Sequence, residues 1–240
     1  MTTVGVLGAR GRMGREVCSA VDAASDLTLG PQVDVDGELD ELSGSDVVVV
    51  FTAAGQAMDG LRWCAAAGVH AVVGTTGFSE DEVAELRRLF LGPPNLALVA
   101  NFAIGAVLLM QLAERCAAHF ATCEITELHH DQKADAPSGT AIVTARRIAA
   151  ARGGEPWSPD PTTAEVVAGA RGGVVEGIHL HAQRQRGMVA SQEIVFGAEG
   201  QWLTLRHDTS SRASFMPGVL LAVRAIGGRP GVTLDLDPFL

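Results

Sequence analysis

Residues 4–14 read VGVLGARGRMG, and this stretch decides how the chain begins to fold. The apolar run Val4–Leu7 is typical of a short buried strand, and we expect a helix over about 12–23. The glycines at positions 8, 11 and 14 lie between them, where a backbone can turn tightly and approach a pyrophosphate at a helix N-terminus. The spacing G-x-x-G-x-x-G is not the common G-x-G-x-x-G, so a turn that merely needs glycine is the alternative.

Beyond this turn, short apolar runs alternate with helical patterns. The predicted strands are 27–34, 46–52, 70–73 and 96–100, and the predicted helices are about 57–67 and 80–90. Val47–Phe51 is apolar throughout, which is typical of a parallel strand covered by helices on both faces. The sequence therefore predicts an α/β fold with an N-terminal doubly wound, Rossmann-like domain. The second strand is the weakest prediction because Pro31 has no N–H for a ladder.

The second half of the chain has a different pattern. An apolar helix is expected over about 105–120, and four alternating runs are typical of antiparallel strands, at 124–129, 179–184, 192–196 and 202–207. A loop rich in Gly and Pro is expected between 152 and 174, and a helix over 215–226 can return to pack on the first domain. We predict a second, mixed α/β domain.

Composition excludes several classes of partner. The 240 residues carry a formal charge of −10 and only 18 Lys and Arg residues, so there is no basic stripe for nucleic acid or an anionic membrane. The four cysteines lack a CxxC spacing, which fits a reduced compartment. No basic segment precedes Val4, as a signal peptide would require. The longest apolar stretch, 96–113, contains the polar residues Asn101 and Gln111, which argues against a membrane span. We expect a reduced, cytoplasmic protein without a signal peptide or membrane span.

The first domain offers a site for a dinucleotide. Asp34 closes the second strand 20 residues after Gly14, where a carboxylate accepts hydrogen bonds from ribose hydroxyls and repels a 2′-phosphate. This favours NADH over NADPH, with Asp36 a weaker candidate for the same role. Arg10 and Arg12 flank the turn and could instead hold a 2′-phosphate, so the preference stays open.

Two further segments follow predicted strands of the same domain. Gly74-Thr75-Thr76-Gly77 follows the strand 70–73, and Ala100-Asn101-Phe102 ends the last parallel strand. Ligands bind at the carboxyl edge of doubly wound sheets, and small residues there let a flat ring lie against the backbone. An ordinary strand-to-helix loop is the alternative for each segment.

Residues 127–141, ELHHDQKADAPSGTA, hold the densest set of chemically active side chains. Pro137 and Ser138 suit a first helical turn, which would leave the amides of Ser138, Gly139 and Thr140 free to bind a carboxylate. The pattern therefore predicts a small acidic substrate.

Three side chains of this segment can exchange or donate protons. His129 or His130 can exchange protons near pH 7, and Lys133, the only lysine beside 17 arginines, can pair with a carboxylate or give up a proton. Adjacent histidines on a strand face opposite ways, so they differ in role unless the chain bends. A metal site with His179 and His181 is the main rival, although no partner has ligand spacing; we predict no metal.

These motifs resemble those of the 4-hydroxy-tetrahydrodipicolinate reductase family of the diaminopimelate and lysine pathway. The resemblance spans nearly the whole chain, and its most specific part is the segment 127–141. It also includes 8–14, 74–78, Asn101-Phe102, 169–172, Ser211-Arg212 and Phe215.

The resemblance implies NAD(P)H-dependent reduction of a cyclic dicarboxylate, after loss of water, to tetrahydrodipicolinate. His129 matches the family's acid/base residue, Lys133 its proton donor, and His130 with Gly139 and Thr140 its carboxylate site. The dinucleotide site matches Gly8, Ala9, Arg10, Gly11, Arg12, Met13, Gly74, Thr75, Thr76, Val99, Ala100, Asn101 and Phe102. The implied dinucleotide domain is 1–102 with 214–240. The implied substrate and oligomerisation domain, 103–213, is built on an open sheet that assembles a homotetramer.

The chain departs from the family pattern at three places. Val50 stands where Asp is common, Ala53-Ala54 replace a frequent His-Pro, and Ser191 replaces a His. These departures permit an inactive paralogue or a dinucleotide-binding sensor, which would have no reason to retain Lys133. The other alternative is a related NAD(P)-dependent reductase of another small imine or amino acid, which should lack the contiguous His-His, Lys and Ser-Gly-Thr set.

Overall fold

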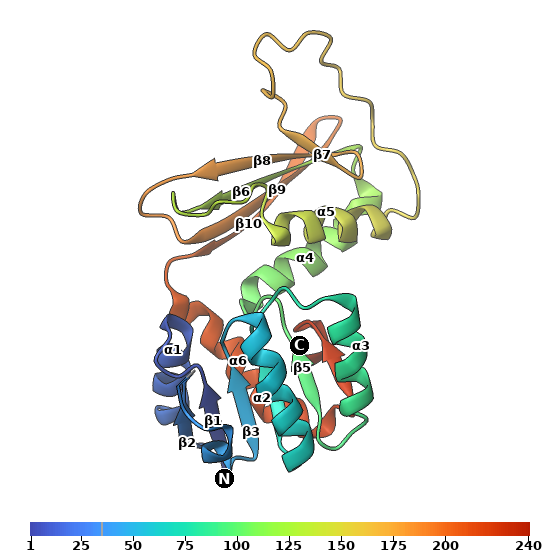
Figure 1. Ribbon diagram of the computed structural model, residues 1–240. Coiled ribbons are helices and arrows are strands. Elements are labelled where there is room, and N and C mark those ends of the chain that lie inside the picture. Colours follow the sequence, from blue (N-terminus) through green and yellow to red (C-terminus); the bar gives the residue numbers. More distant parts are fainter. Residues whose placement is uncertain (35) are drawn as a thin grey trace. The chain divides into compact units, whose positions relative to one another are not determined.

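The computed structural model describes residues 1–34 and 36–240 and confirms the predicted fold class (Figure 1). The chain divides into two compact units. Unit 1 comprises Met1–Ile104 with Arg212–Leu240, and unit 2 comprises Gly105–Ser211.

Unit 1 is built on a parallel sheet of six strands in the order β11-β5-β4-β3-β1-β2. The strands are β1 (Thr2–Leu7), β2 (Leu27–Val33), β3 (Val47–Val50), β4 (His70–Val73), β5 (Leu96–Leu98) and β11 (Val232–Leu234). The four valines of β3 are buried because this central strand is covered on both faces.

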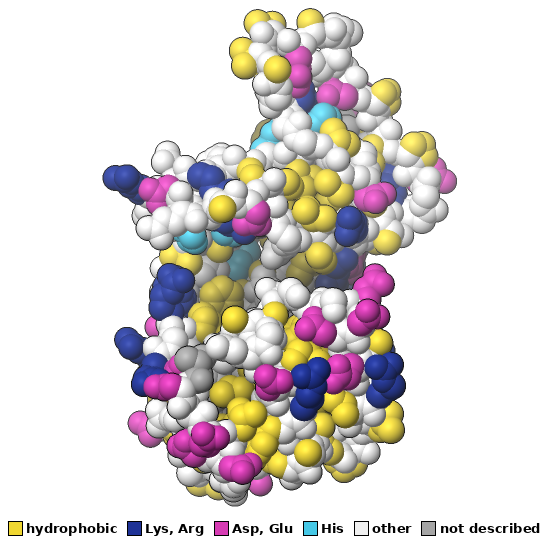
Figure 2. Space-filling model, viewed as in Figure 1, with side chains coloured by type: hydrophobic (Ala, Val, Ile, Leu, Met, Phe, Trp, Pro, Cys, Tyr) yellow, Lys and Arg dark blue, Asp and Glu magenta, His cyan; other side chains and the backbone are white. Residues whose placement is uncertain are grey.

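Four helices cover the sheet of unit 1. They are α1 (Arg12–Asp22), α2 (Ala54–Ala67), α3 (Glu80–Leu89) and α6 (Met216–Ala225). Helix α2 packs with α3 on one face, while α1 packs with α6 on the other (Figure 1). Figure 2 shows acidic and basic side chains interspersed on the visible face of this unit, without a continuous basic patch on that face.

The second strand forms although it contains Pro31. Val4 pairs with Leu29 and Val6 with Gln32, so two residues of β2, Gly30 and Pro31, oppose one residue of β1. The strand is also the edge of the sheet, so its outer side needs no donor. A bulge at an edge is where a strand tolerates proline, which explains why the strand survives.

Strand β11 was not predicted, because three residues between glycine and aspartate carry too little pattern. It pairs with β5 in parallel, so the C-terminal segment after α6 comes back to the edge of the sheet. Asn95, just before β5, holds this segment in place. The buried Asn95 side chain donates to the carbonyls of Ile226 and Gly227 at 2.8 and 3.2 Å, and its oxygen accepts from the Gly231 amide.

Unit 2 has a five-stranded mixed sheet in the order β10-β9-β6-β8-β7. Its strands are β6 (Thr122–His129), β7 (Gly173–Val175), β8 (Ile178–Arg184), β9 (Ala190–Ala198) and β10 (Gln201–Thr209). Only β6 and β8 run parallel to each other; the other neighbours are antiparallel. The short β7 was not predicted and ends the long loop after residue 152.

Two helices, α4 (Ile104–Cys116) and α5 (Gly139–Ala151), pack on one face of this sheet. Alternate strand residues enter the shared core, among them Ile125 on β6 and Ile194 on β9. Helix α4 ends earlier than expected and continues as a short turn, Ala117–His119. Within residues 1–34 and 36–240, no helix has the length and apolar character needed to cross a bilayer.

Replacing Asn95 by Ala should lower the free energy of unfolding by about 1–3 kcal/mol, because two carbonyls and one amide lose their partner in a buried place. Urea denaturation measures the change. Leu91→Ala is the control, since Leu91 is 79% exposed and its truncation should change stability by less than about 0.5 kcal/mol. Equal effects of the two substitutions would show that the Asn95 hydrogen bonds do not hold the segment that leads into β11.

Candidate functional site

The glycine-rich turn after β1 is shaped by two close backbone approaches. Gly8 has φ +88°, and a Cβ there would lie 2.3 Å from the Phe51 carbonyl oxygen. A Cβ at Gly14 would lie 2.1 Å from the Gly8 carbonyl oxygen, so α1 can start this close to the turn only with glycine. Gly11 is the N-cap of α1, and the first amides of the helix lack intrahelical acceptors.

Cavities open on either side of this turn. One of about 350 Å³ is lined by Gly11, Arg12 and Met13 together with Thr52 and residues 74–76. The other, of about 480 Å³, is lined by Ala9, Arg10, Arg15, Asp34 and Asp36, among others. The turn with the helix amides between two hollows fits a dinucleotide whose pyrophosphate lies at the helix start.

The cavity beside Asp34 has an acidic balance. The Asp34 carboxylate accepts a hydrogen bond from the Arg10 amide at 2.7 Å, and the Arg10 guanidinium pairs with both Asp34 and Asp36. Three carboxylates, counting Glu41, face two guanidinium groups, those of Arg10 and Arg15. Arg10 is therefore already neutralised, and Arg12 lines the other cavity, which weakens the expectation that these two residues hold a 2′-phosphate.

Residues 74–76 and 99–102 follow β4 and β5 at the same edge of the sheet as the glycine turn. A Cβ at Gly74 would lie 2.0 Å from the Phe51 ring, and this ring packs on Phe102 with centroids 5.9 Å apart. Thr75 donates its hydroxyl to the Thr52 carbonyl at 2.9 Å. Phe51, which the sequence analysis did not predict as a site residue, thus packs against both the segment after β4 and the segment after β5.

The end of β6 gathers three polar groups around one buried carboxylate. Glu127 is 1% exposed, and its Oε2 lies 2.5 Å from His129 Nδ1. Arg184, opposite His129 on β8, donates to both Glu127 oxygens at 2.8 and 2.7 Å. The Ser138 amide donates to Oε1 at 3.0 Å. Burial would raise the pKa of Glu127, but the hydrogen bonds from Arg184 and His129 outweigh it and hold the pKa below its usual value.

The start of α5 differs in part from the expectation. Ser138 is the N-cap and its hydroxyl accepts from the Ala141 amide at 3.1 Å, so Pro137 precedes the helix instead of opening it. The Ser138 amide was expected to be free, and this was wrong because Glu127 accepts its hydrogen bond. The amides of Gly139 and Thr140 are the first of the helix, where the helix itself supplies no acceptor.

His130 and Lys133 lie on the loop between β6 and α5. The chain bends after His129, and the His130 Nδ1 accepts from the Gln132 amide at 3.3 Å. The Lys133 ammonium lies 2.8 Å from both Asp135 oxygens, and this hydrogen bonding lowers the pKa of Asp135. Arg184 also donates to the Asp135 carbonyl at 2.7 Å, so the loop with Lys133 is tied to the Glu127 cluster.

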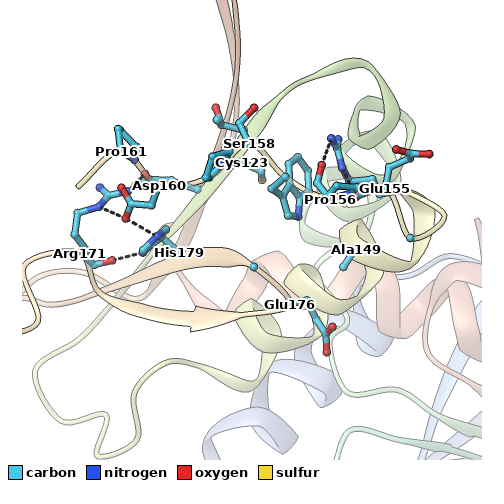
Figure 3. A pocket seen from close by; sticks show the side chains of 17 residues that line it. Cys123, Ala149, Glu155, Pro156, Ser158, Asp160, Pro161, Arg171, Glu176 and His179 are labelled. Carbon is cyan, nitrogen blue, oxygen red and sulfur yellow. Dashed lines mark hydrogen bonds and ion pairs between the residues drawn. The ribbon is translucent and has the colours of Figure 1, made fainter. Parts of the chain in front are cut away.

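A larger hollow of unit 2, about 590 Å³, contains none of the predicted site residues (Figure 3). Arg171 and His179 face Asp160 there, and the His179 Nδ1 donates to the Arg171 carbonyl at 2.6 Å. His181 has a different partner, Glu124, so the two histidines of the metal alternative do not share an acidic group. Across the described residues, no three His, Cys, Asp or Glu side chains come together as a metal site.

Comparisons with known proteins agree over the whole chain. Residues 2–101 match the family model described as "Dihydrodipicolinate reductase, N-terminus", and residues 105–240 match "Dihydrodipicolinate reductase, C-terminus". The 4-hydroxy-tetrahydrodipicolinate reductases of Cutibacterium acnes and Nocardia farcinica are each 50% identical, over 100% and 99% of this chain and 99% and 98% of theirs. The dipicolinate-bound dihydrodipicolinate reductase of Paenisporosarcina sp. TG-14 is 35% identical, with a TM-score of 0.90 over 100% of both chains.

Replacing Gly8 by Ala should weaken NADH binding at least about tenfold, because the new Cβ meets the Phe51 carbonyl and displaces the turn. Titration of NADH fluorescence measures the affinity. Gly44→Ala is a matched control, since Gly44 has φ +87° but nothing within 4 Å of the added Cβ. Both variants carry the strain of a positive φ, and an equal loss of affinity in both would contradict the role of the turn.

Proposed function

The chain belongs to the dihydrodipicolinate reductase family, and we propose that it reduces 4-hydroxy-tetrahydrodipicolinate to tetrahydrodipicolinate with loss of water, using NAD(P)H. The observation that carries this proposal is the cluster at the end of β6 and the start of α5. A histidine on a buried carboxylate, an ammonium group and a helix start lie within 15 residues there, 127–141. An inactive sensor or a reductase of another imine finds no support in the comparisons.

The substrate is a dicarboxylate, and the helix start supplies what a carboxylate needs. The amides of Gly139 and Thr140 point out of the N-terminus of α5, where the helix dipole favours negative charge. His130 is the side chain that we assign to the same carboxylate. Ser138 contributes by capping the helix, because its amide and hydroxyl are already engaged.

Two side chains handle protons in this proposal. His129 exchanges a proton as water leaves the ring, and Lys133 donates one from Nζ when the ring is reduced. An ammonium group has three N–H donors, so Lys133 can contact Asp135 and still offer an N–H to a substrate. Arginine could not replace it as a donor, because a guanidinium does not release its proton in proteins.

The hydride comes from a reduced nicotinamide dinucleotide, which supplies a hydride and a planar ring when bound. We assign the pyrophosphate to the glycine turn and the α1 amides, the adenosine ribose to Asp34, and the ring to the small residues 74–76 and to 99–102. The close approaches at Gly8 and Gly74, which a Cβ would block, support this fit. The acidic balance around Asp34 favours NADH over NADPH.

We also propose a homotetramer, as the family resemblance implies. The sheet of unit 2 has a second face that α4 and α5 do not cover, and Trp202 on that face is 77% exposed. An exposed large aromatic side chain on a sheet face that no helix covers favours assembly through that face.

Turnover tests the proposed reaction directly. The substrate is generated in the cuvette by the synthase that precedes this step, and loss of reduced nicotinamide absorbance is followed with NADH and with NADPH. Oxidation that depends on the synthase supports the proposal. Binding of NADH without oxidation would instead favour a sensor or another substrate.

Replacing Lys133 by Ala should lower kcat at least about 100-fold and leave the NADH affinity nearly unchanged, because Lys133 lies outside the dinucleotide site. Steady-state kinetics and NADH titration measure the two effects. Lys133→Arg is the matched variant, since it keeps the positive charge and the Asp135 partner but cannot donate a proton. Full activity of the Arg variant would show that the charge alone matters.

Replacing Asp34 by Asn should raise kcat/KM for NADPH relative to NADH at least about tenfold, because a negative charge that repels the 2′-phosphate is removed. The side-chain oxygen of Asn can still accept from the Arg10 amide, so the turn should keep its shape. Asp59→Asn is the control, since the Asp59 carboxylate lies on α2 and pairs with Arg62. An unchanged cofactor ratio in the Asp34 variant would remove Asp34 from this role.

A further inference from the structure

We propose that Glu127 is a positioning residue, which holds His129 in the tautomer with the proton on Nδ1 and also anchors the start of α5. His129 Nε2 is then the nitrogen that exchanges a proton with the substrate. This inference rests on the proposed function, because that function gives His129 its proton-exchange role.

The contacts of Glu127 determine the tautomer. An ionised carboxylate has no hydrogen to donate, and Glu127 accepts from Arg184 at both oxygens as well as from the Ser138 amide. The hydrogen between Glu127 Oε2 and His129 Nδ1, 2.5 Å apart, therefore belongs to the imidazole. In a neutral imidazole this leaves Nε2 as the acceptor, in the arrangement by which a buried carboxylate orients a catalytic histidine.

Strand geometry brings these groups together. Glu127 and His129 are two residues apart on β6, so their side chains leave the same face of the sheet. His129 is paired in register with Arg184 on the parallel strand β8, which brings the guanidinium within reach of both Glu127 oxygens. Arg184 also holds the Asp135 carbonyl, so the carboxylate fixes the histidine, the helix start and the loop of Lys133 together.

The same strand carries a second set of this kind. Glu124 lies on the opposite face of β6, and its carboxylate contacts His181 Nε2 at 2.8 Å and Arg171. Here the carboxylate faces the Nε2 nitrogen of its histidine instead of Nδ1. Glu124→Gln therefore removes a carboxylate from a His and an Arg without touching the site, and it is the matched control for Glu127→Gln.

Glu127→Gln should switch the tautomer of His129. The Gln oxygen is expected at the Oε1 position, because the Ser138 amide can only donate. The Gln NH₂ then faces His129, which can turn from donor to acceptor at Nδ1 by moving its proton to Nε2. At the Oε2 position the NH₂ faces one fixed donor, an Arg184 nitrogen, whereas the opposite orientation would place it against two, the Ser138 amide and the other Arg184 nitrogen, and is disfavoured.

Nitrogen NMR of protein with ¹⁵N-labelled histidine tests the tautomer without turnover, with the His129 signal assigned by its loss in His129→Gln. We expect Nδ1–H in the wild type, Nε2–H in Glu127→Gln, and no change at His129 in Glu124→Gln. Wild-type His129 in the Nε2–H form would overturn the proposal, even if Glu127→Gln does not fold. Because this readout needs no substrate, it is independent of whether the proposed reaction is correct.

Kinetics separate positioning from a merely structural role. Glu127→Gln should lower kcat about 100-fold or more with little change in the substrate KM, since the Gln oxygen still accepts from Ser138. Glu127→Ala should lower kcat and also raise KM, because the helix start loses its anchor. The proposal is overturned if Glu127→Gln raises KM as much as Glu127→Ala does, or if its kcat matches that of Glu124→Gln.

Discussion

Parallel pairing of the six strands in unit 1 is the constraint on which the proposed dinucleotide site depends. Parallel strands all end at one edge of the sheet, so the loops after β1, β4 and β5 lie on the same side although they are far apart in sequence. Buried valines of β3 hold the centre of this sheet, and the last of them, Val50, pairs with Leu7 and Val73. The site edge thus depends on an apolar core that contributes no catalytic group.

In unit 2 a charge plays the comparable part. Glu127 is almost fully buried, and a buried carboxylate is tolerated only when its oxygens are satisfied. Arg184, His129 and the Ser138 amide satisfy them, and each of these partners belongs to a different element. The ion pair therefore links β6, β8 and α5 at the point where the acid chemistry is proposed. A hydrophobic residue at the same place would pack there but would not orient an imidazole.

Much of this arrangement was predictable because it is local. The glycine turn, Asp34 after β2 and the segment 127–141 each show their chemistry within a few residues. What the sequence did not indicate depends on distant pairing: Arg184 reaches Glu127 across 57 residues, and β11 is identifiable only once β5 is known. The bulge that accommodates Pro31 likewise depends on the register against β1, which no local pattern specifies. The Ser138 amide was misjudged although its acceptor Glu127 is only 11 residues away, because the segment alone does not show that the β6 strand buries this carboxylate beside the helix start.

The geometry of the ion pairs also explains why the chain uses arginine almost everywhere and lysine at one position. Arginine supplies the structural pairs of the chain, such as Arg184 with Glu127, Arg62 with Glu85 and Arg224 with Asp26, where a planar fork meets two carboxylate oxygens. A guanidinium is the better choice for such fixed pairs because its donors are preorganised and its charge is permanent. The permanent charge makes it useless where a proton must leave. The only lysine occurs on a loop that Arg184 holds in place, with Asp135 as its exposed partner. A chain that otherwise relies on arginine for its ion pairs therefore has an ammonium group at the one position where our proposed reaction requires a proton donor.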